Sequence, residues 1–410
     1  MKNNFKKNVV WNTLGMTFNS FNSLFFLILV NRINGINTAG IFSFAFSVAC
    51  LLYVVGIYSG RTFQVSDIKG ELNDKEYLVH KILTCLIMII IVMFFILIKD
   101  YTLDKNLIIV IMTVYKLLEA FSETFYGYLQ KNEELHIVGK SLFYKSIVGL
   151  MVFFFVDYFT KNIVLSCVAL VINSIVYIIF YDIRKSISLI SKDKVRINKV
   201  LKLFKIGFSV FVFSFLAIFI VNVPKYVIDV LLSDSYQTIF SIIIMPGTVM
   251  SLCGQYIMAP LLTQVVDFYN QQLYDEFINL IIKMIKILIL LGFLVEVVAA
   301  FIGIPVLSFI YSINLDKYKI DLILVIFGAI LYALSGVLST ALVTMRKNTI
   351  QMLIYIIDSI FSIFACYILI KSFGVHGAVY GYVLTMVLHS MLYIFYFMFE
   401  FKKCKKNINL

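Results

Sequence analysis

The chain has 410 residues, of which 61% are hydrophobic and only 14% are charged, whereas soluble domains carry roughly 45–50% apolar and about 25% charged residues. A water-soluble fold cannot hide so much apolar surface, because its exterior must remain polar, so the composition excludes a soluble enzyme and predicts a membrane protein. The net charge of +12 comes from basic residues that lie mostly between apolar segments, which argues against a nucleic-acid partner.

Long apolar segments recur along the whole chain. A helix that crosses the hydrocarbon core needs roughly 20 mainly apolar residues, so these segments predict an all-α polytopic fold of about 12 transmembrane helices. The expected spans are 9–31, 38–60, 80–98, 106–128, 138–158, 162–182, 203–223, 236–262, 283–310, 321–344, 350–371 and 375–399. The connections between them are short, which makes the helical hairpin the repeated unit.

Polar residues recur at helical spacing in the first two spans. Asn12 and Asn19 fall on one stripe of the first span, and Ser43, Ser47 and Arg61 share a face of the second. Such stripes either mediate helix packing in a membrane or line a hydrated cavity. Several stripes together favour the cavity.

The fourth span carries three charged residues along one side, Lys116, Glu119 and Glu123. Each bare charge at mid-membrane depth costs roughly 2.5–3.5 kcal/mol, so the three must be paired or hydrated. Lys116 and Glu119 lie one turn apart and can neutralise each other, whereas Glu119 and Glu123 repel when both are ionised. This side of the helix is a candidate proton or sodium site, and a purely structural ion-pair network is the alternative.

Basic residues also indicate orientation and the division of the chain. Most of the 35 lysines and arginines lie on the same side of the membrane as the N-terminus, with Lys81 and Lys145 counted among the connections on that side. Basic residues are retained on the cytoplasmic side. Both termini are therefore expected in the cytoplasm. The predicted organisation is an N-terminal six-helix bundle (1–183), a basic cytoplasmic linker (184–202), a pseudo-symmetric C-terminal six-helix bundle (203–400) and a basic cytoplasmic tail (401–410). Two such halves are typical of duplicated transporters.

Ionisable and polar residues are also present within the spans of the second half. Gln255 continues a polar stripe of the eighth span that begins at Ser241, and Asp358 lies in the eleventh span. Asp358 is a candidate for cation coupling or equally a neutral, buried hydrogen-bonding partner. His389 in the last span is interpreted as the latter.

Four segments resemble landmarks of polysaccharide repeat-unit flippases, which belong to the multidrug/oligosaccharidyl-lipid/polysaccharide exporter superfamily. Residues 29–45 (LVNRINGINTAGIFSFA) resemble the loop between the first two helices of those proteins, and residues 60–67 (GRTFQVSD) resemble the segment after their second helix. Residues 222–229 (NVPKYVID) and 307–318 (LSFIYSINLDKY) are similar to two landmarks of the second half. The chain departs from the usual loop pattern in having no proline before Arg32 and no Leu-Gly after it.

The resemblance implies a flippase for undecaprenyl-pyrophosphate-linked oligosaccharides in capsule or O-antigen assembly, resident in the bacterial cytoplasmic membrane. A sugar-pyrophosphate head group needs a wet, cationic route past the acyl chains. The expected head-group ligands are Arg61, Lys116, Arg32, Lys225, Asn19 and Gln255. Cation coupling by H+ or Na+ is expected at Glu119, Glu123 or Asp358. No cofactor or metal is expected, and the expected partners are the lipid-linked substrate, membrane lipids and polysaccharide polymerase or assembly proteins.

Two other functions remain open. A cation-coupled drug exporter of the same superfamily would have the same helices. A membrane-embedded polysaccharide polymerase or glycosyltransferase is disfavoured, because every external connection is short and the four histidines form no metal or nucleophile motif. The chain is therefore expected to be a transporter and not an enzyme.

Overall fold

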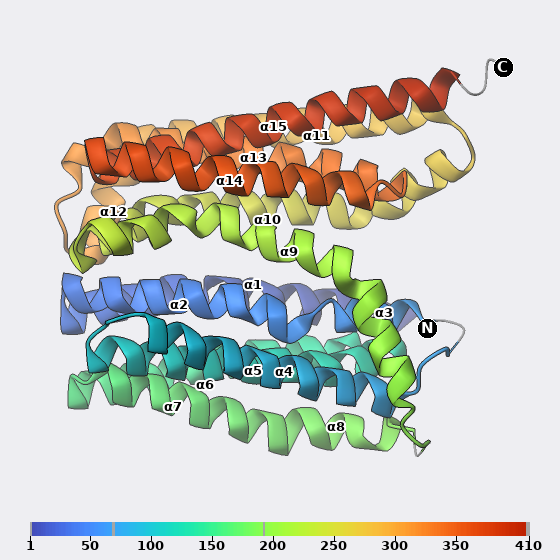
Figure 1. Cartoon of the computed structure of the whole chain (residues 1–410), viewed down its shortest axis with the longest axis horizontal. Coiled ribbons are helices and arrows are strands. Elements are labelled where there is room, and N and C mark those ends of the chain that lie inside the picture. Colours follow the sequence, from blue (N-terminus) through green and yellow to red (C-terminus); the bar gives the residue numbers. More distant parts are fainter. Residues whose placement is uncertain (1, 68–69, 192, 407–410) are drawn as a thin grey trace. The chain divides into compact units, whose positions relative to one another are not determined.

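The computed structural model describes residues 2–67, 70–191 and 193–406, and every regular element in these ranges is helical (Figure 1). The chain divides into two compact units, Met1–Phe215 and Leu216–Leu410, called here the N-terminal and C-terminal units. The predicted all-α polytopic class is confirmed. Residue 192 of the predicted linker and residues 407–410 of the predicted tail lie outside the described residues.

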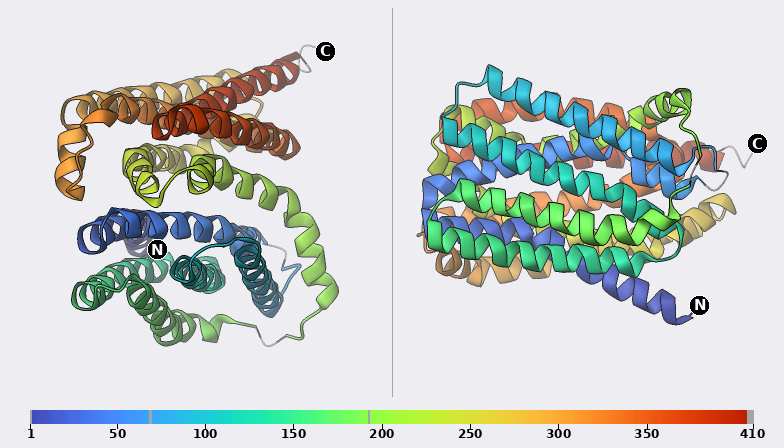
Figure 2. Two further views of the ribbon diagram at one scale, coloured as in Figure 1. Left: turned by 60° about the vertical axis from the view of Figure 1, so that its left-hand side comes forward. Right: turned by 90° about the horizontal axis from the view of Figure 1, so that it is seen from below.

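The N-terminal unit is a bundle of long helices with short connections (Figures 1 and 2). Within it, α1 packs against α6, α2 packs against α5, and α6 packs against α7. Its elements are α1 (Lys2–Asn34), α2 (Ile36–Ile57), α3 (Gly60–Ser66), α4 (Asp74–Ile98), α5 (Leu103–Lys131), α6 (Leu135–Thr160), α7 (Ile163–Tyr177), the π-helix η1 (Ile178–Ile183), α8 (Arg184–Ser186), the 3-10 helix η2 (Ile187–Leu189) and the first part of α9 (Ile197–Leu231).

The C-terminal unit contains the end of α9 and a second set of long helices. Its α14 packs against α15, and α13 packs against both α10 and α15. Its further elements are α10 (Asp234–Asn270), α11 (Tyr274–Val298), the π-helix η3 (Ala299–Gly303), α12 (Ile304–Tyr311), the 3-10 helix η4 (Asp316–Tyr318), α13 (Lys319–Thr344), α14 (Asn348–Phe373) and α15 (Val375–Lys406).

Polar residues in the connections determine where several helices begin. The Asn73 side chain accepts a hydrogen bond from the Glu76 amide, and the Glu76 carboxylate accepts one from the Asn73 amide, which forms a capping box at the start of α4. Thr102 caps α5 and Asn162 caps α7 in the same manner, through side-chain oxygens that accept from backbone amides. These caps satisfy donors that the first turn of a helix leaves unpaired.

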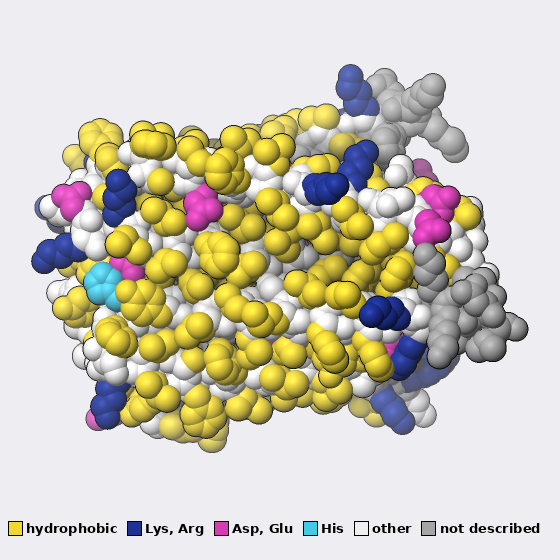
Figure 3. All heavy atoms as spheres, turned by 90° about the horizontal axis from the view of Figure 1, so that it is seen from above, with side chains coloured by type: hydrophobic (Ala, Val, Ile, Leu, Met, Phe, Trp, Pro, Cys, Tyr) yellow, Lys and Arg dark blue, Asp and Glu magenta, His cyan; other side chains and the backbone are white. Residues whose placement is uncertain are grey.

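In the described part of the chain, eleven helices are long and apolar enough to cross a membrane. The 29-residue α5 is also long enough, but Lys116, Glu119 and Glu123 make it too polar by composition alone. With α5 included, every expected span except 38–60 lies, to within one residue, inside a helix or a continuous helical run. The face of the molecule in Figure 3 is mostly hydrophobic, and most of the charged side chains visible there lie towards its two ends, as expected for a surface in contact with lipid.

Two expectations of the sequence differ from the structure. The span 38–60 is interrupted, because Tyr58 and Ser59 adopt left-handed backbone conformations with φ of 39° and 55° and end α2 before α3 begins. Lys81 and Lys145, counted with the cytoplasmic connections, are instead buried inside α4 and α6. A lysine can lie inside a bundle when its ammonium group finds polar partners there, and both do.

Candidate functional site

A pocket of about 730 Å³ opens inside the N-terminal unit. Five helices, α1, α2, α3, α5 and α6, supply its walls, which mix amide, hydroxyl and charged groups with apolar side chains. The lining residues are Asn12, Met16, Asn19, Ser20, Tyr53, Arg61, Thr62, Val65, Ser66, Glu123, Gln130, Leu135 and Leu142. The pocket therefore combines predicted head-group ligands (Arg61 and Asn19) with a predicted coupling residue (Glu123).

Arg61 is the cation of this pocket and is held by two residues of α5. Its Nη1 lies 3.0 Å from Glu123 Oε2, and its Nε and Nη2 donate to Gln130 Oε1 at 3.0 and 2.8 Å. The guanidinium carbon lies 5.8 Å from the ring centroid of Tyr126. The Arg61 side chain remains 24% exposed. The planar group is thus fixed on one side while part of it still faces the open pocket.

The break between α2 and α3 sets the position of Arg61. The buried Lys81 ammonium donates to the carbonyl oxygens of Gly56 at 2.8 Å and Ile57 at 3.1 Å, and the Thr84 hydroxyl also donates to Gly56. A cation near the last turn also interacts favourably with the negative end of the helix dipole. The carbonyls that the end of α2 leaves unpaired are therefore satisfied inside the bundle.

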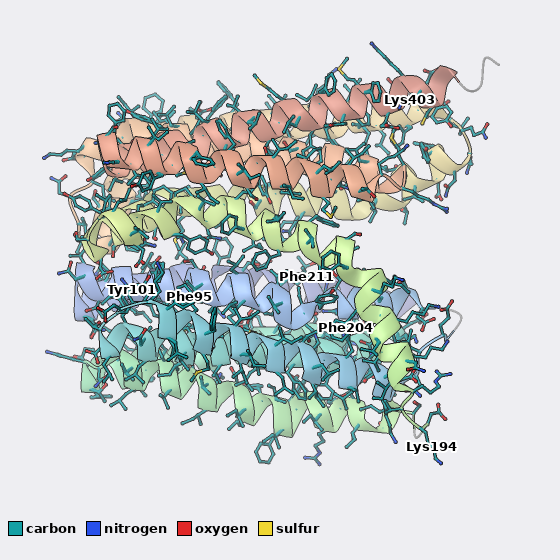
Figure 4. The ribbon with its side chains drawn as sticks, in the orientation of Figure 1. Phe95, Tyr101, Lys194, Phe204, Phe211 and Lys403 are labelled. Atoms are coloured by element: carbon teal, nitrogen blue, oxygen red, sulfur yellow. The ribbon has the colours of Figure 1, made fainter. Side chains whose placement is uncertain are left out.

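Aromatic packing fixes the same break from the other side. Tyr58 stacks on Phe211 of α9 with ring centroids 4.5 Å apart and contacts Phe204 edge-on at 5.1 Å (both α9 residues are labelled in Figure 4). The Tyr58 hydroxyl donates to the Phe204 carbonyl oxygen at 3.1 Å. Gly207 of α9 lies so close that an added Cβ would be 3.2 Å from the Tyr58 ring. A larger side chain at position 207 would displace the Tyr58 ring.

Lys116 and Glu119 form an ion pair on α5, as their spacing predicts. Lys116 Nζ lies 2.7 Å from Glu119 Oε2, and the two side chains are 13% and 12% exposed. The ammonium also lies 4.9 Å from the ring centroid of Phe46 and 5.8 Å from that of Tyr53. Since Glu119 has Lys116 and Glu123 has Arg61, the expected repulsion between the two glutamates is offset by two cations.

A second buried ion pair was missed by the sequence reasoning. Lys145 Nζ of α6 lies 3.1 Å from Asp182 Oδ2 in the π-helix η1, and it donates to the hydroxyls of Ser122 at 3.1 Å and Tyr126 at 3.2 Å. The Ser141 hydroxyl donates to the other oxygen of Asp182 at 2.5 Å. Lys145 falls inside the expected span 138–158, which was the available signal, and π-helical turns are frequent at functional sites.

The two cation clusters meet at Tyr126. Its ring centroid lies 5.8 Å from the Arg61 guanidinium and 5.7 Å from the Lys145 ammonium, and its hydroxyl bonds within the Lys145–Asp182 pair. Tyr126 is only 1% exposed. The buried pair therefore supports the aromatic ring beside which the pocket arginine lies.

Of the remaining predicted ligands, Lys116 and Arg32 do not line this pocket, and Lys225 and Gln255 belong to the C-terminal unit. Arg32 is exposed near the end of α1, and Lys225 is half-buried in α9. Gln255 is exposed on α10 of the C-terminal unit. Asn19 lines the pocket and accepts a hydrogen bond from the Ser146 hydroxyl at 3.5 Å. The structure thus brings Arg61, Asn19 and Glu123 around one space of the N-terminal unit.

Asp358 of the C-terminal unit is fully buried and paired. His389 Nδ1 of α15 lies 2.6 Å from Asp358 Oδ2, and the His389 side chain is 1% exposed. Sequence reasoning named both residues but did not connect them, since 31 positions separate them.

No model of a known protein family matches the chain. A capsular polysaccharide biosynthesis protein, CapF, of Staphylococcus aureus is 26% identical over 336 residues, which cover 79% of this chain and 83% of that protein. Among solved structures, an inward-facing multidrug resistance MATE family transporter of the MOP superfamily aligns with a TM-score of 0.72 at 12% identity, covering 96% of this chain and 99% of that one. The lipid II flippase MurJ, in an inward closed conformation, aligns with a TM-score of 0.72 at 15% identity, covering 97% and 90%.

These structural neighbours are transporters, and both likenesses extend over nearly the whole chain. The expected resemblance to this superfamily is confirmed at the level of the fold. The protein is a multi-pass membrane protein with the fold of the MOP superfamily of transporters and a distant relative in capsular polysaccharide biosynthesis.

Proposed function

We propose that this protein moves undecaprenyl-pyrophosphate-linked oligosaccharide repeat units across the bacterial cytoplasmic membrane. The observation that carries the proposal is Arg61, a partly exposed guanidinium on the wall of a pocket of about 730 Å³. The fold shared with a lipid II flippase and the capsular relative support the same substrate class.

The chemistry of the pocket suits an anionic head group attached to sugars. Arg61 can bind a phosphate with paired donors, because its guanidinium presents several N–H groups in one plane. Asn12, Asn19 and Ser20 supply amide and hydroxyl groups that can replace water around sugar hydroxyls. The isoprenoid tail stays in the bilayer while the head group crosses in the pocket.

Binding of a pyrophosphate at Arg61 requires the guanidinium to be shared with Glu123 or released from it. Arg61 Nη1 and Glu123 Oε2 are 3.0 Å apart, and an incoming dianion repels the Glu123 carboxylate. Glu123 therefore acts as an internal competitor that favours release of the head group once the pocket opens to the far side. Lys116, Arg32 and Lys225 would attract the head group before or after this step.

Transport proceeds by alternating access, in which the pocket opens first to one side of the membrane and then to the other. Cation binding biases this equilibrium only if the cation binds the two states with different affinities. In this proposal both termini lie in the cytoplasm, and a polysaccharide polymerase on the outer side would receive the product. The protein acts as a carrier and breaks no covalent bond.

The test is complementation of a deletion strain in the native host. Arg61→Ala should abolish polymer at the cell surface and cause lipid-linked oligosaccharide to accumulate on the cytoplasmic leaflet, with unchanged abundance of the protein in the membrane. Arg184→Ala is the matched control, because Arg184 is exposed on α8 and does not line the pocket.

Normal surface polymer in the Arg61→Ala strain would remove the pocket from the transport route. Normal polymer in the deletion strain, together with increased sensitivity to cationic drugs, would instead support the drug-exporter alternative.

A further inference from the structure

We propose that Asp358 and His389 form a proton-binding pair in the C-terminal unit, and that the ion exchanged during transport is a proton and not sodium. This inference rests on the proposed function and deepens it, because it names the coupling ion and its site. It also changes the interpretation of His389 from a passive hydrogen-bonding group to half of the site.

The pair is buried between two adjacent helices, and the arrangement in which it is buried is called here the closed state. His389 Nδ1 of α15 and Asp358 Oδ2 of α14 are 2.6 Å apart, and the two side chains are 1% and 0% exposed. Asp358 Oδ1 has no hydrogen-bond partner among the described residues. A buried charged oxygen without a partner is costly, so a proton on the pair stabilises this closed state.

The surroundings of the pair are aromatic and uncharged. The rings of Tyr332 (α13), Tyr355 (α14) and Tyr393 (α15) lie 5.5, 5.0 and 4.7 Å from the His389 ring, measured between centroids. The other charged residues of α14 and α15, and those of α13 and α10, which pack against them, lie within two turns of their helix ends. The pair therefore has no fixed charge nearby that would hold it in one protonation state.

Asp358 differs from the other two coupling candidates, Glu119 and Glu123, in the residue that pairs with its carboxylate. Glu119 is paired with an ammonium at 2.7 Å and Glu123 with a guanidinium at 3.0 Å, and the ordinary pKa values of lysine and arginine side chains lie far above neutral pH. Asp358 is paired with an imidazole, the side chain that changes charge near neutral pH. Of the three, only Asp358 has a partner suited to exchange a proton under cellular conditions.

The same donor set does not suit sodium. A hard cation prefers several oxygen ligands, whereas the group bound to Asp358 is an imidazole nitrogen. The site thus has the chemistry of a proton acceptor.

The proposed exchange involves one proton. In the closed state one proton is shared between Asp358 Oδ2 and His389 Nδ1, and the pair is neutral overall. When the site opens to water, the pair can release this proton to a water molecule, which leaves an aspartate, a neutral imidazole and a hydrated proton. Since the charged pair is stable only when hydrated, proton binding shifts the equilibrium towards the closed state.

The direct test is infrared difference spectroscopy of the purified full chain in lipid nanodiscs, titrated between about pH 5 and 8. The wild type should show a protonated-carboxyl band that changes together with imidazole bands, and Asp358→Asn should remove the carboxyl band. His389→Gln should shift the titration, whereas sodium added at constant pH should leave the spectrum unchanged. A spectrum that Asp358→Asn leaves intact, or that sodium changes as protons do, would overturn the proposal.

The chain offers a matched control in its second histidine–aspartate pair. His376 Nδ1 lies 2.7 Å from Asp321 Oδ2, but the His376 side chain is 44% exposed. His376→Gln should leave the band assigned to Asp358 in place. Loss of that band in His376→Gln would show that the signal does not belong to the buried pair, which counts against the proposal.

The functional test uses inside-out membrane vesicles of the native host, in which lipid-linked oligosaccharide is made from radiolabelled nucleotide sugars. An imposed pH gradient should change the translocation rate of the wild type by up to about tenfold per pH unit, and His389→Gln should flatten this dependence. An unaltered pH dependence in His389→Gln would overturn the inference alone. Absence of translocation in the wild type, with the infrared titration intact, would overturn the proposed function while supporting the proton-binding pair.

Discussion

The ammonium of Lys81, buried in α4, donates a hydrogen bond of 2.8 Å to the carbonyl oxygen of Gly56 at the end of α2. This contact joins two helices at the point where the chain breaks and turns into α3. Arg61, the pocket cation, lies in the first turn of α3, so we expect the lysine to influence the geometry of the pocket although it does not line it.

Replacing Lys81 with methionine should therefore destabilise the protein and weaken transport together. The buried carbonyls of Gly56 and Ile57 would lose a charged donor, at a cost of about 1–3 kcal/mol. The melting temperature in detergent should fall. Lys185→Met on exposed α8 is the control and should change stability by less than about 0.5 kcal/mol. Equal melting temperatures for the two variants would contradict a role for Lys81 in holding the break.

Replacing Glu123 with glutamine should strengthen anion binding at Arg61. The variant keeps a hydrogen-bond acceptor beside the guanidinium but removes the competing negative charge 3.0 Å away. The affinity for inorganic pyrophosphate, measured by calorimetry, should rise by up to about tenfold, equivalent to about 1.4 kcal/mol.

Glu119→Gln serves as the comparison for this prediction, because Glu119 is paired with Lys116 and does not line the pocket. It should leave pyrophosphate binding nearly unchanged. Weaker binding in Glu123→Gln than in the wild type would show that Glu123 positions the guanidinium more than it competes for it.

Removing one member of the Lys145–Asp182 pair should be strongly destabilising. The two side chains are 7% and 0% exposed, and a buried ion pair that loses one partner leaves an uncompensated charge that costs about 3–5 kcal/mol. Lys145→Met alone should lower the melting temperature sharply, whereas the double variant Lys145→Met with Asp182→Asn should recover part of the loss. If the loss of stability in the double variant equals the sum of the losses in Lys145→Met and Asp182→Asn measured separately, the two groups do not interact as the distance implies.

Acid should loosen the connection between α3 and α4. Asp67 accepts hydrogen bonds from the backbone amides of Leu72 and Glu71, both at 3.0 Å, and from the Tyr77 hydroxyl at 3.1 Å. Burial acts to raise the pKa of Asp67, but these hydrogen bonds outweigh it, so the pKa lies below its usual value. A carboxyl with a lowered pKa in the folded state contributes stability above its unfolded pKa of about 4, and this is lost as the pH falls through the folded value.

The check for this acid sensitivity is the melting temperature as a function of pH. Asp67→Asn should be less stable than the wild type near neutral pH, and the difference between the two should shrink as the pH falls below about 4. A difference that stays constant down to that range would mean that the carboxylate charge contributes nothing at this connection.

Sequence alone determined the helical class, the positions of the spans and the charged side of α5. Each of these depends on local properties, because apolar segments of sufficient length must be helical in lipid whatever their neighbours are, and a pair three residues apart, such as Lys116 and Glu119, meets on any helix. The same local rule failed at Tyr58 and Ser59, where the break depends on Lys81 and on the aromatic residues of α9.

Only the tertiary structure decided which distant groups meet. Arg61 contacts Glu123 across 62 positions, Lys145 contacts Asp182 across 37, and Asp358 contacts His389 across 31. Spacing along one helix carries no information about contacts between helices, because these depend on how each helix is rotated and which neighbours it packs against. The sequence therefore supplied the charged groups, and the packing of the helices decided which of them became partners and which faced a pocket.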